Sequence, residues 1–261
     1  MYKRMNFEFN GDPIAIVVNP EKKKKNDVIS VDNDRTKSKE PFEQFRCQPQ
    51  QSIQHIPNPN QERSILYITG ASGSGKSWYV KEFALQYKKM YPKREIFCFS
   101  ALADDKGSLD KIKGLKRVRI HEPEFMIEPI ATEEFKESLV IFDDTEAISD
   151  KKLRKKVHTI MDGILTTGRH FKISCCVCTH TACNANETKL ILCETHSITI
   201  FPNGLGGRSL KYLLEGYFGL SKAQIKKIKS LKSRWVTINK TYPMTVISEN
   251  EAYVLSHNEE D

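Results

Sequence analysis

The sequence has no long hydrophobic run, no apolar leader and no internal repeat. A membrane-spanning helix needs about 18 consecutive apolar residues, and no stretch of the chain approaches that length. The N-terminal residues MYKRMNFEFN lack the apolar core of a secretory signal. We therefore expect neither a transmembrane protein nor a secreted disulfide scaffold nor a collagen-like fibre.

Cysteine is present, but in no arrangement that predicts a disulfide framework or a metal site. There are seven cysteines, an odd number. Cys175, Cys176 and Cys178 lie in the apolar run ISCCVC, where neighbouring strand residues point to opposite faces and therefore pair poorly. No second CxxC-like pair accompanies them, as a zinc site would require. The sequence predicts reduced, mostly buried thiols in an intracellular protein.

The ends of the chain differ from its middle in composition and in hydrophobic periodicity. The 261 residues are enough for one domain with a proper core, although two small domains would also fit. Residues 1–60 are polar and aperiodic, so we expect a flexible arm there, with one short ordered piece around Phe42 and Phe45. The run KKKK at 22–25 is typical of a solvated charge cluster; a nucleic-acid or targeting role is the minority alternative. Residues 257–261, HNEED, predict an acidic tail.

The middle of the chain alternates between buried-strand and helix patterns. Apolar periodicity at i, i+3, i+4 and i+7 predicts helices over 80–87 and 153–164. Six apolar runs show no alternation, which suits strands buried on both faces of a parallel sheet. The sequence thus predicts an α/β core over 61–205, with a mainly parallel central sheet flanked by helices. The six runs are 65–69, 95–100, 118–120, 139–144, 173–179 and 197–201.

A complete phosphate-binding loop follows the first of these runs. GASGSGKS fits GxxxxGK[ST] and stands between a predicted strand and a predicted helix, the context that the motif requires. Its backbone N–H groups and the helix N-terminus favour phosphate. We expect Lys76 to reach the β- and γ-phosphates of ATP, and Ser77 to bind Mg²⁺. An ordinary turn is the alternative. The nucleotide-binding residues are Gly70, Ala71, Ser72, Gly73, Ser74, Gly75, Lys76 and Ser77.

Two carboxylates end the strand LVIFDD at 139–144. Ligands bind beyond the carboxyl ends of strands in open α/β sheets. Asp143 is therefore expected in the Mg²⁺ shell, and Asp144 is expected to polarise the water that attacks the γ-phosphate. Two alternatives stay open: Asp144 caps a helix that starts near Ile148, or Glu146 is the catalytic acid.

The interval between the two motifs bears on the class of P-loop protein. Strand patterns at 95–100 and 117–120 lie between them. This favours the class in which an extra strand separates the phosphate-loop strand from the strand with the acid pair. Members of that class hydrolyse ATP with an added acid, whereas small-molecule kinases usually place the two strands side by side.

Two more polar residues flank the run 173–179. His180 follows it, at a strand tip where a side chain can sense the γ-phosphate; its alternative is to anchor a loop. Arg169, in TTGRH, could stabilise transition-state charge in its own subunit or across a ring interface. The alternatives for Arg169 are capping of helix carbonyls and DNA binding.

The C-terminal third is basic. Residues 205–240 carry nine Lys and Arg against one acid. Ser221 and Gln224 have the capping-box spacing, and the helix that they begin places lysines on one face. Such a stripe is typical of contacts to a phosphate backbone; a solvated helix face and a sequence-reading helix-turn-helix are the alternatives. We expect residues 206–256 to form a basic helix-turn-helix-like segment and a β-hairpin packed on the core. The candidate DNA contacts are Lys222, Lys226, Lys229 and Lys232.

Together these segments resemble the poxvirus-type genome-packaging ATPases of large double-stranded DNA viruses, in the FtsK–HerA group of P-loop motors. The resemblance covers residues 61–255 and implies a RecA-like core that assembles as a homo-oligomeric ring. It implies that ATP hydrolysis drives duplex DNA, independently of sequence, into a capsid through capsid or portal components. It places the protein in host cytoplasm or viral factories, or on the virion. The segments are ITGASGSGKS, LVIFDD, ILTTGRHFKISCCVCTH, ETHSITIFPNG, KYLLEGYFGL and SRWVTI.

The resemblance also assigns residues. Lys76 and Ser77 match the Walker A pair, and Asp143 matches the Walker B acid. Asp144 stands where the wider group often has Glu, and His180 stands where Gln is common, so the residue that positions the water stays open. Arg169 matches the arginine of TTGRH. The rival hypotheses are a P-loop nucleoside or polynucleotide kinase, a loader of the AAA type, and a nucleotide-dependent DNA-binding scaffold.

Overall fold

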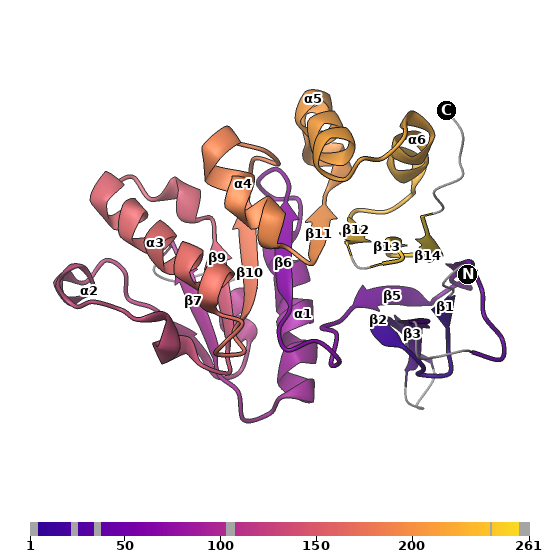
Figure 1. Ribbon diagram of the computed structural model, residues 1–261, viewed down its shortest axis with the longest axis horizontal. Coiled ribbons are helices and arrows are strands. Elements are labelled where there is room, and N and C mark those ends of the chain that lie inside the picture. The colour runs from indigo at the N-terminus through magenta and orange to yellow at the C-terminus, as the bar shows by residue number, and fades with distance from the viewer. Residues whose placement is uncertain (1–4, 22–25, 34–37, 103–107, 241, 256–261) are drawn as a thin grey trace. The chain divides into compact units, whose positions relative to one another are not determined.

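The computed structural model describes residues 5–21, 26–33, 38–102, 108–240 and 242–255. The chain divides into two compact units, one formed by Glu62–Thr195 and the other by Met1–Gln61 together with His196–Asp261 (Figure 1). The lysine run at 22–25 and the tail at 257–261 lie outside the described residues. Within the described part, no helix combines the length and the apolar character that crossing a membrane requires.

The unit Glu62–Thr195 is built on a parallel sheet with the strand order β6-β10-β9-β7-β8. Every residue of β6, β9 and β10 is buried, as expected of strands covered on both faces. The edge strand β8 was expected at 118–120 but lies three residues earlier, because an edge strand is only partly buried and does not need an apolar run. The strands are β6 (Ile65–Thr69), β7 (Ile96–Ser100), β8 (Leu115–Arg117), β9 (Leu139–Asp143) and β10 (Ser174–Thr179).

The strand order places an extra strand between the phosphate-loop strand β6 and the acid-pair strand β9, as the sequence predicted. The intervening strand is β10, however, and not one of the two strand patterns that lie between the motifs in sequence. From β6 the chain crosses to β7, and from β9 it returns toward β6, so the two crossovers run in opposite directions. Right-handed crossovers then place the connecting helices α1 and α3 on opposite faces.

The helices of this unit bury apolar stripes against the sheet. Helix α1 (Lys76–Met90) buries Tyr79, Val80 and Phe83, and α3 (Lys151–Thr167) buries the stripe that its 3.6-residue period predicts. Helices α2 (Pro123–Ile127) and α4 (Ala185–Glu194) are shorter.

The C-terminal end of α3 is closed by a buried arginine. The guanidinium of Arg63 donates to the carbonyl oxygens of Ile164 at 2.7 Å and Leu165 at 2.8 Å. A cation at this end also suits the helix dipole. The capping role considered above for Arg169 is therefore performed by Arg63. Gly168 follows the helix, and a Cβ built on it would lie 2.3 Å from the oxygen of Ile164 and 3.1 Å from Nη1 of Arg63.

The first 60 residues are not a flexible arm, and that expectation is wrong. Four of their strands form an antiparallel sheet of order β1-β3-β2-β5, whose buried residues include Ile14, Ile29 and Ile53. The apolar run IAIVV was not interpreted as a strand because the residues around it are polar. It is buried only when other strands pair with it. The strands are β1 (Met5–Asn6), β2 (Asp12–Val18), β3 (Asp27–Val31) and β5 (Ser52–His55).

Five further strands of the same unit pair antiparallel, in the order β4-β14-β13-β12-β11. The sequence predicted only a small hairpin after residue 206. It also assigned the run at 197–201 to the core, whereas in the structure the strand formed by this run belongs to the present unit. Phe42, just before β4, and Phe45, within β4, pack beside Phe7. The strands are β4 (Gln44–Arg46), β11 (Ser197–Ile200), β12 (Val236–Asn239), β13 (Thr245–Ser248) and β14 (Glu251–Val254).

Helical segments connect β11 to β12. Helix α5 (Gly207–Lys211) continues into a π-helical turn (Tyr212–Tyr217), and α6 (Lys222–Ser230) follows. Ser221 and Gln224 form the predicted capping box: each backbone N–H donates to the other's side chain, at 3.0 and 3.2 Å.

The seven cysteines are free, and four of them are buried. Burial raises the pKa of the Cys175 thiol to about 12 and the pKa values of Cys176 and Cys178 well above the ordinary value. These three residues of β10 are therefore uncharged packing groups at neutral pH.

Gly168→Ala is expected to lower the free energy of unfolding by about 1–3 kcal/mol, because the added methyl group would clash with the backbone oxygen of Ile164 and crowd the guanidinium of Arg63. Urea unfolding followed by circular dichroism measures the loss. Gly206→Ala is the matched control, since a Cβ there meets nothing within 4 Å. Equal stability of the two variants would contradict this account of the helix end.

Candidate functional site

The phosphate loop connects β6 to α1 and has the backbone that the motif requires. Gly73 and Gly75 have φ of 73° and 110°, in the left-handed region that glycine alone adopts at little cost. The first backbone bond of the helix runs from the Tyr79 N–H to the Gly75 oxygen, at 3.0 Å. The N–H groups before Tyr79 have no acceptor within the helix, and no acidic residue stands in its first turn. This end of α1 therefore favours an anion.

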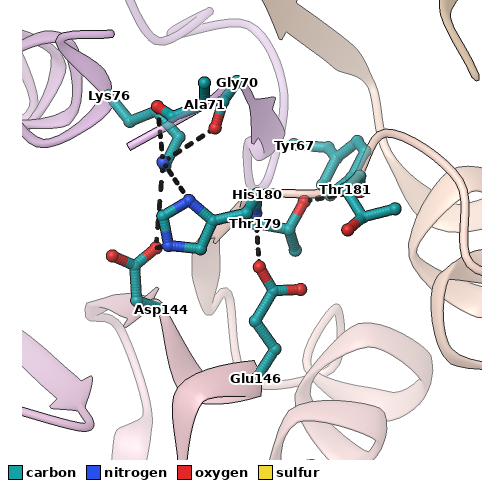
Figure 2. A network of polar contacts seen from close by, with 9 residues as sticks. All are labelled: Tyr67, Gly70, Ala71, Lys76, Asp144, Glu146, Thr179, His180 and Thr181. Carbon is teal, nitrogen blue, oxygen red and sulfur yellow. Dashed lines mark hydrogen bonds and ion pairs between the residues drawn. The ribbon is translucent and has the colours of Figure 1, made fainter. Parts of the chain in front are cut away.

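The ammonium of Lys76 lies at the centre of a polar network (Figure 2). The side chain is only 5% exposed. Its Nζ donates to the oxygens of Gly70 at 2.9 Å and Ala71 at 3.3 Å, and lies 3.1 Å from Nδ1 of His180. The Asp144 carboxylate is 3.9 Å away. A buried charge needs such partners, and these come from both the loop and the ends of other strands.

The His180 imidazole bridges Lys76 and Asp144. An ammonium can only donate, so Nδ1 of His180 is the acceptor in the Lys76 contact. The ring proton is then on Nε2, which lies 3.1 Å from Oδ1 of Asp144. The predicted strand-tip residue is thus in direct contact with both the phosphate-loop lysine and the predicted catalytic acid.

Asp144 adopts a left-handed backbone conformation immediately after β9, with φ 49° and ψ 35°. Such a conformation is uncommon outside glycine, although Asp tolerates it better than most residues. The sharp turn directs the carboxylate toward His180 and Lys76. Asp144 precedes a 3-10 turn (Thr145–Ala147), but its side chain makes no capping hydrogen bond. The helix expected near Ile148 begins at Lys151 instead, and Asp150 caps it, accepting from the N–H groups of Lys152 at 2.7 Å and Leu153 at 3.0 Å.

Asp143 is the last residue of β9 and is 4% exposed. It stands opposite Cys178 in the strand register, and its charge adds to the effect of burial in raising the pKa of that thiol. The described residues contain no group of three or more His, Cys, Asp and Glu that could hold a metal ion by themselves. A Mg²⁺ site needs no such group, because Mg²⁺ is bound by one or two protein oxygens together with water and phosphate. The hydroxyl of Ser77 and the carboxylate of Asp143 are oxygen donors of that kind.

Glu146, the other candidate acid, has a different task in the structure. Its carboxylate accepts a hydrogen bond from the backbone N–H of His180 (Figure 2). The side chain therefore holds the segment that carries the imidazole. Asp144, not Glu146, makes the contacts with Lys76 and with the ring of His180.

Tyr67 is a site residue that the sequence analysis missed. Its hydroxyl lies 2.7 Å from Oγ1 of Thr179, 2.9 Å from the oxygen of Thr181 and 3.2 Å from the oxygen of Ala182. Burial raises the pKa of Tyr67 above its usual value. These bonds fix the residues on both sides of His180. The only signal in the sequence is a tyrosine with a polar tip inside an otherwise apolar strand.

The structure does not bring Arg169 to this network. Its Nε donates to Oε2 of Glu62 at 2.7 Å, and this pairing lowers the pKa of the glutamate carboxyl. Glu62 precedes β6, whereas the phosphate loop follows it, and five strand residues span about 16 Å. Arg169 therefore lies at the amino edge of the sheet, with its side chain 73% exposed.

The four candidate DNA-contacting lysines are exposed, on or just after α6. The helix turns Ile225 and Ile228 inward and therefore directs Lys222, Lys226 and Lys229 outward. Lys227 of the same helix lies over the ring of Tyr253, 4.4 Å from its centroid, and belongs to a packing contact.

One relative matches along nearly the whole chain. "Uncharacterized protein V3" of Sputnik virophage is 34% identical over 258 residues, which are 98% of this chain and 100% of that protein. No protein-family model matches the sequence.

Solved structures show the fold. The genome packaging NTPase B204 from Sulfolobus turreted icosahedral virus 2, in complex with AMPPCP, aligns with a TM-score of 0.50 at 15% identity, over 72% of this chain and 98% of that chain. B204, the DNA-packaging ATPase from Sulfolobus turreted icosahedral virus, aligns with a TM-score of 0.49 at 17% identity, over the same shares of the two chains. The fold of the present chain is that of a P-loop NTPase, as expected. The finer assignment to the poxvirus type stays a prediction.

Proposed function

The chain belongs to the family of protein V3 of Sputnik virophage, and we propose that it is an ATP-driven translocase that packages viral double-stranded DNA into a capsid. The observation that carries the proposal is the contact of Lys76 with His180 and Asp144 beside a complete phosphate loop. The fold shared with a viral genome packaging NTPase supports it. This role would place the protein in the cytoplasm or viral factories of the host, or on the virion. The poxvirus-type assignment is proposed on the resemblance of the sequence motifs.

In the proposed site, the phosphate loop binds the β- and γ-phosphates of ATP, which Lys76 neutralises. Ser77 and Asp143 would hold Mg²⁺, which supplies charge stabilisation to the phosphates. Asp144 polarises the attacking water, and its carboxylate lies beside Nε2 of His180. His180 also contacts Lys76 and can therefore report on the γ-phosphate that this lysine binds.

The geometry favours Asp144 over Glu146 as the catalytic acid. The carboxylate of Glu146 already accepts the N–H of His180, whereas Asp144 faces the phosphate-loop lysine directly. A base must lie within hydrogen-bond reach of the water it activates, close to the γ-phosphate. Glu146 is a positioning residue in this proposal.

Arg169 acts across a subunit interface in the proposed mechanism. It lies at the opposite edge of its own sheet from the phosphate loop and is largely exposed. An arginine so placed can enter the site of a neighbouring copy, where it stabilises transition-state charge. This role requires a homo-oligomeric ring or an equivalent assembly.

Double-stranded DNA is the proposed cargo, with capsid or portal components as further partners. The exposed lysines of α6 present charges at a spacing of one helical turn, without polar groups suited to reading base edges. Contacts of this kind neutralise phosphates independently of sequence.

The strand order argues against the kinase alternative. A strand between β6 and β9 makes room for a residue at its tip, here His180, between the lysine and the acid. A DNA-binding scaffold without hydrolysis would need neither this imidazole nor the strained turn at Asp144.

The central test is ATP hydrolysis with and without long duplex DNA. We expect DNA to stimulate turnover, and both Lys76→Ala and Asp144→Asn to abolish it, the latter by about 10²–10⁴-fold with ATP binding retained. Glu146→Gln is the matched control, because the amide oxygen can still accept the His180 N–H; its activity should fall far less. Equal rates with and without DNA would instead support a kinase or a scaffold, and loss of activity only in Glu146→Gln would exchange the roles of the two acids.

Mixing of variants tests the role of Arg169. Arg169→Ala should reduce hydrolysis by about 10²–10³-fold while leaving ATP binding intact. When it is mixed with Lys76→Ala, activity should return in part, because each Lys76→Ala subunit still offers its arginine to a neighbour. Lys172→Ala, an exposed cation in the same segment, is the control. No recovery at any mixing ratio would exclude action across subunits.

Salt titration tests the DNA contacts. The double variant Lys226→Ala, Lys229→Ala should weaken DNA binding equally for unrelated sequences, and should reduce the slope of log K against log salt by about 2. Lys93→Ala, which removes an exposed lysine from the turn after α1, should leave both unchanged. An unaltered slope in the double variant would show that α6 does not contact DNA.

A further inference from the structure

An exposed tryptophan stands in the first turn of the phosphate-loop helix. Trp78 is 50% exposed, two residues after Lys76, while the next two residues, Tyr79 and Val80, are buried. The other tryptophan of the chain, Trp235, is 4% exposed. Half of the indole surface of Trp78 is therefore accessible to a ligand bound at the adjacent loop.

The geometry of a helix places the indole beside the loop. Each residue advances the helix by 1.5 Å and turns it by 100°, so Trp78 lies about 3 Å along the axis from Lys76 and is rotated by about 200°. Helical side chains lean toward the N-terminus of their helix, which here is the phosphate-loop end. The indole therefore extends toward the loop on the side turned away from Lys76.

The direction of a bound nucleotide follows from the same two residues. Lys76 binds the β- and γ-phosphates, and the loop and the first turn of α1 surround the α- and β-phosphates. The γ-phosphate end is the end where His180 and Asp144 contact Lys76. The nucleoside must then leave the loop on the side away from these residues, which is the side of Trp78.

We propose that Trp78 stacks on the base of the bound nucleoside triphosphate and forms the base subsite of the chain. This inference rests on the proposed function, because it requires a triphosphate at the phosphate loop. Stacking uses the π-face that every base has and does not read its edges. The subsite therefore binds adenine and guanine with similar affinity, and it makes the affinity for a nucleotide higher than the affinity for a bare phosphate chain.

The experiment compares ligands that differ only in the nucleoside. The probes are AMPPCP, its guanine counterpart and inorganic tripolyphosphate, titrated with Mg²⁺ into the full chain and followed by calorimetry and tryptophan emission. In the native chain we expect both nucleotides to change the emission of Trp78, and tripolyphosphate to change it little. Trp78→Phe should lose this signal but keep most of the affinity.

Trp78→Ala separates base binding from phosphate binding. The substitution should lower the affinity for both nucleotides by about 5–150-fold, while the affinity for tripolyphosphate stays within about twofold. Phe9→Ala removes an aromatic side chain that is 60% exposed in the other unit, and should change neither affinity.

Two results would overturn the inference while leaving the proposed function standing. The first is unchanged nucleotide affinity in Trp78→Ala. The second is an equal loss for the nucleotides and tripolyphosphate, which would assign the residue to the loop itself or to contacts between copies. A native chain that bound none of the three ligands would overturn the proposed function together with this inference.

Discussion

The buried ammonium of Lys76 is the constraint around which the site is arranged. A charge that is 5% exposed is costly unless polar groups surround it. Its partners come from the loop after β6, the tip of β10 and the turn after β9. These three strand ends must therefore be neighbours, and the order β6-β10-β9 satisfies that need. The strand order and the electrostatics of the lysine are two aspects of one requirement.

The residues that touch the lysine are held in turn by residues that do not. Tyr67 fixes the carbonyls that follow His180, and Glu146 fixes its backbone N–H. The imidazole is thereby supported from the neighbouring strand β6 and from the turn after β9. Positioning of this kind matters because a displacement of about 1 Å at a reacting group can cost about a hundredfold in rate.

The sequence predicted the parts of the fold and the site whose chemistry is local. The phosphate loop, the strand with Asp143 and Asp144, and the capping box at Ser221 are contiguous patterns with their own physical signature. The N-terminal sheet was missed because β2 and β5 pair across a long stretch of polar chain, and periodicity carries no information on such pairing. Arg169 shows an unused signal: it precedes its strand, and ligands bind beyond the carboxyl ends of strands, so its own sequence position already indicated the opposite edge.

The position of Arg169 links chemistry to assembly in the proposed translocase. Within one chain, Lys76 is the cation of the network in Figure 2, and the second cation of the proposed site lies at the far edge of the same sheet. A site that obtains this charge from a neighbour is complete only when two copies are in register. Hydrolysis in one copy then depends on the placement of the next, which is the dependence that a ring needs if its copies are to pull on one polyanion in turn.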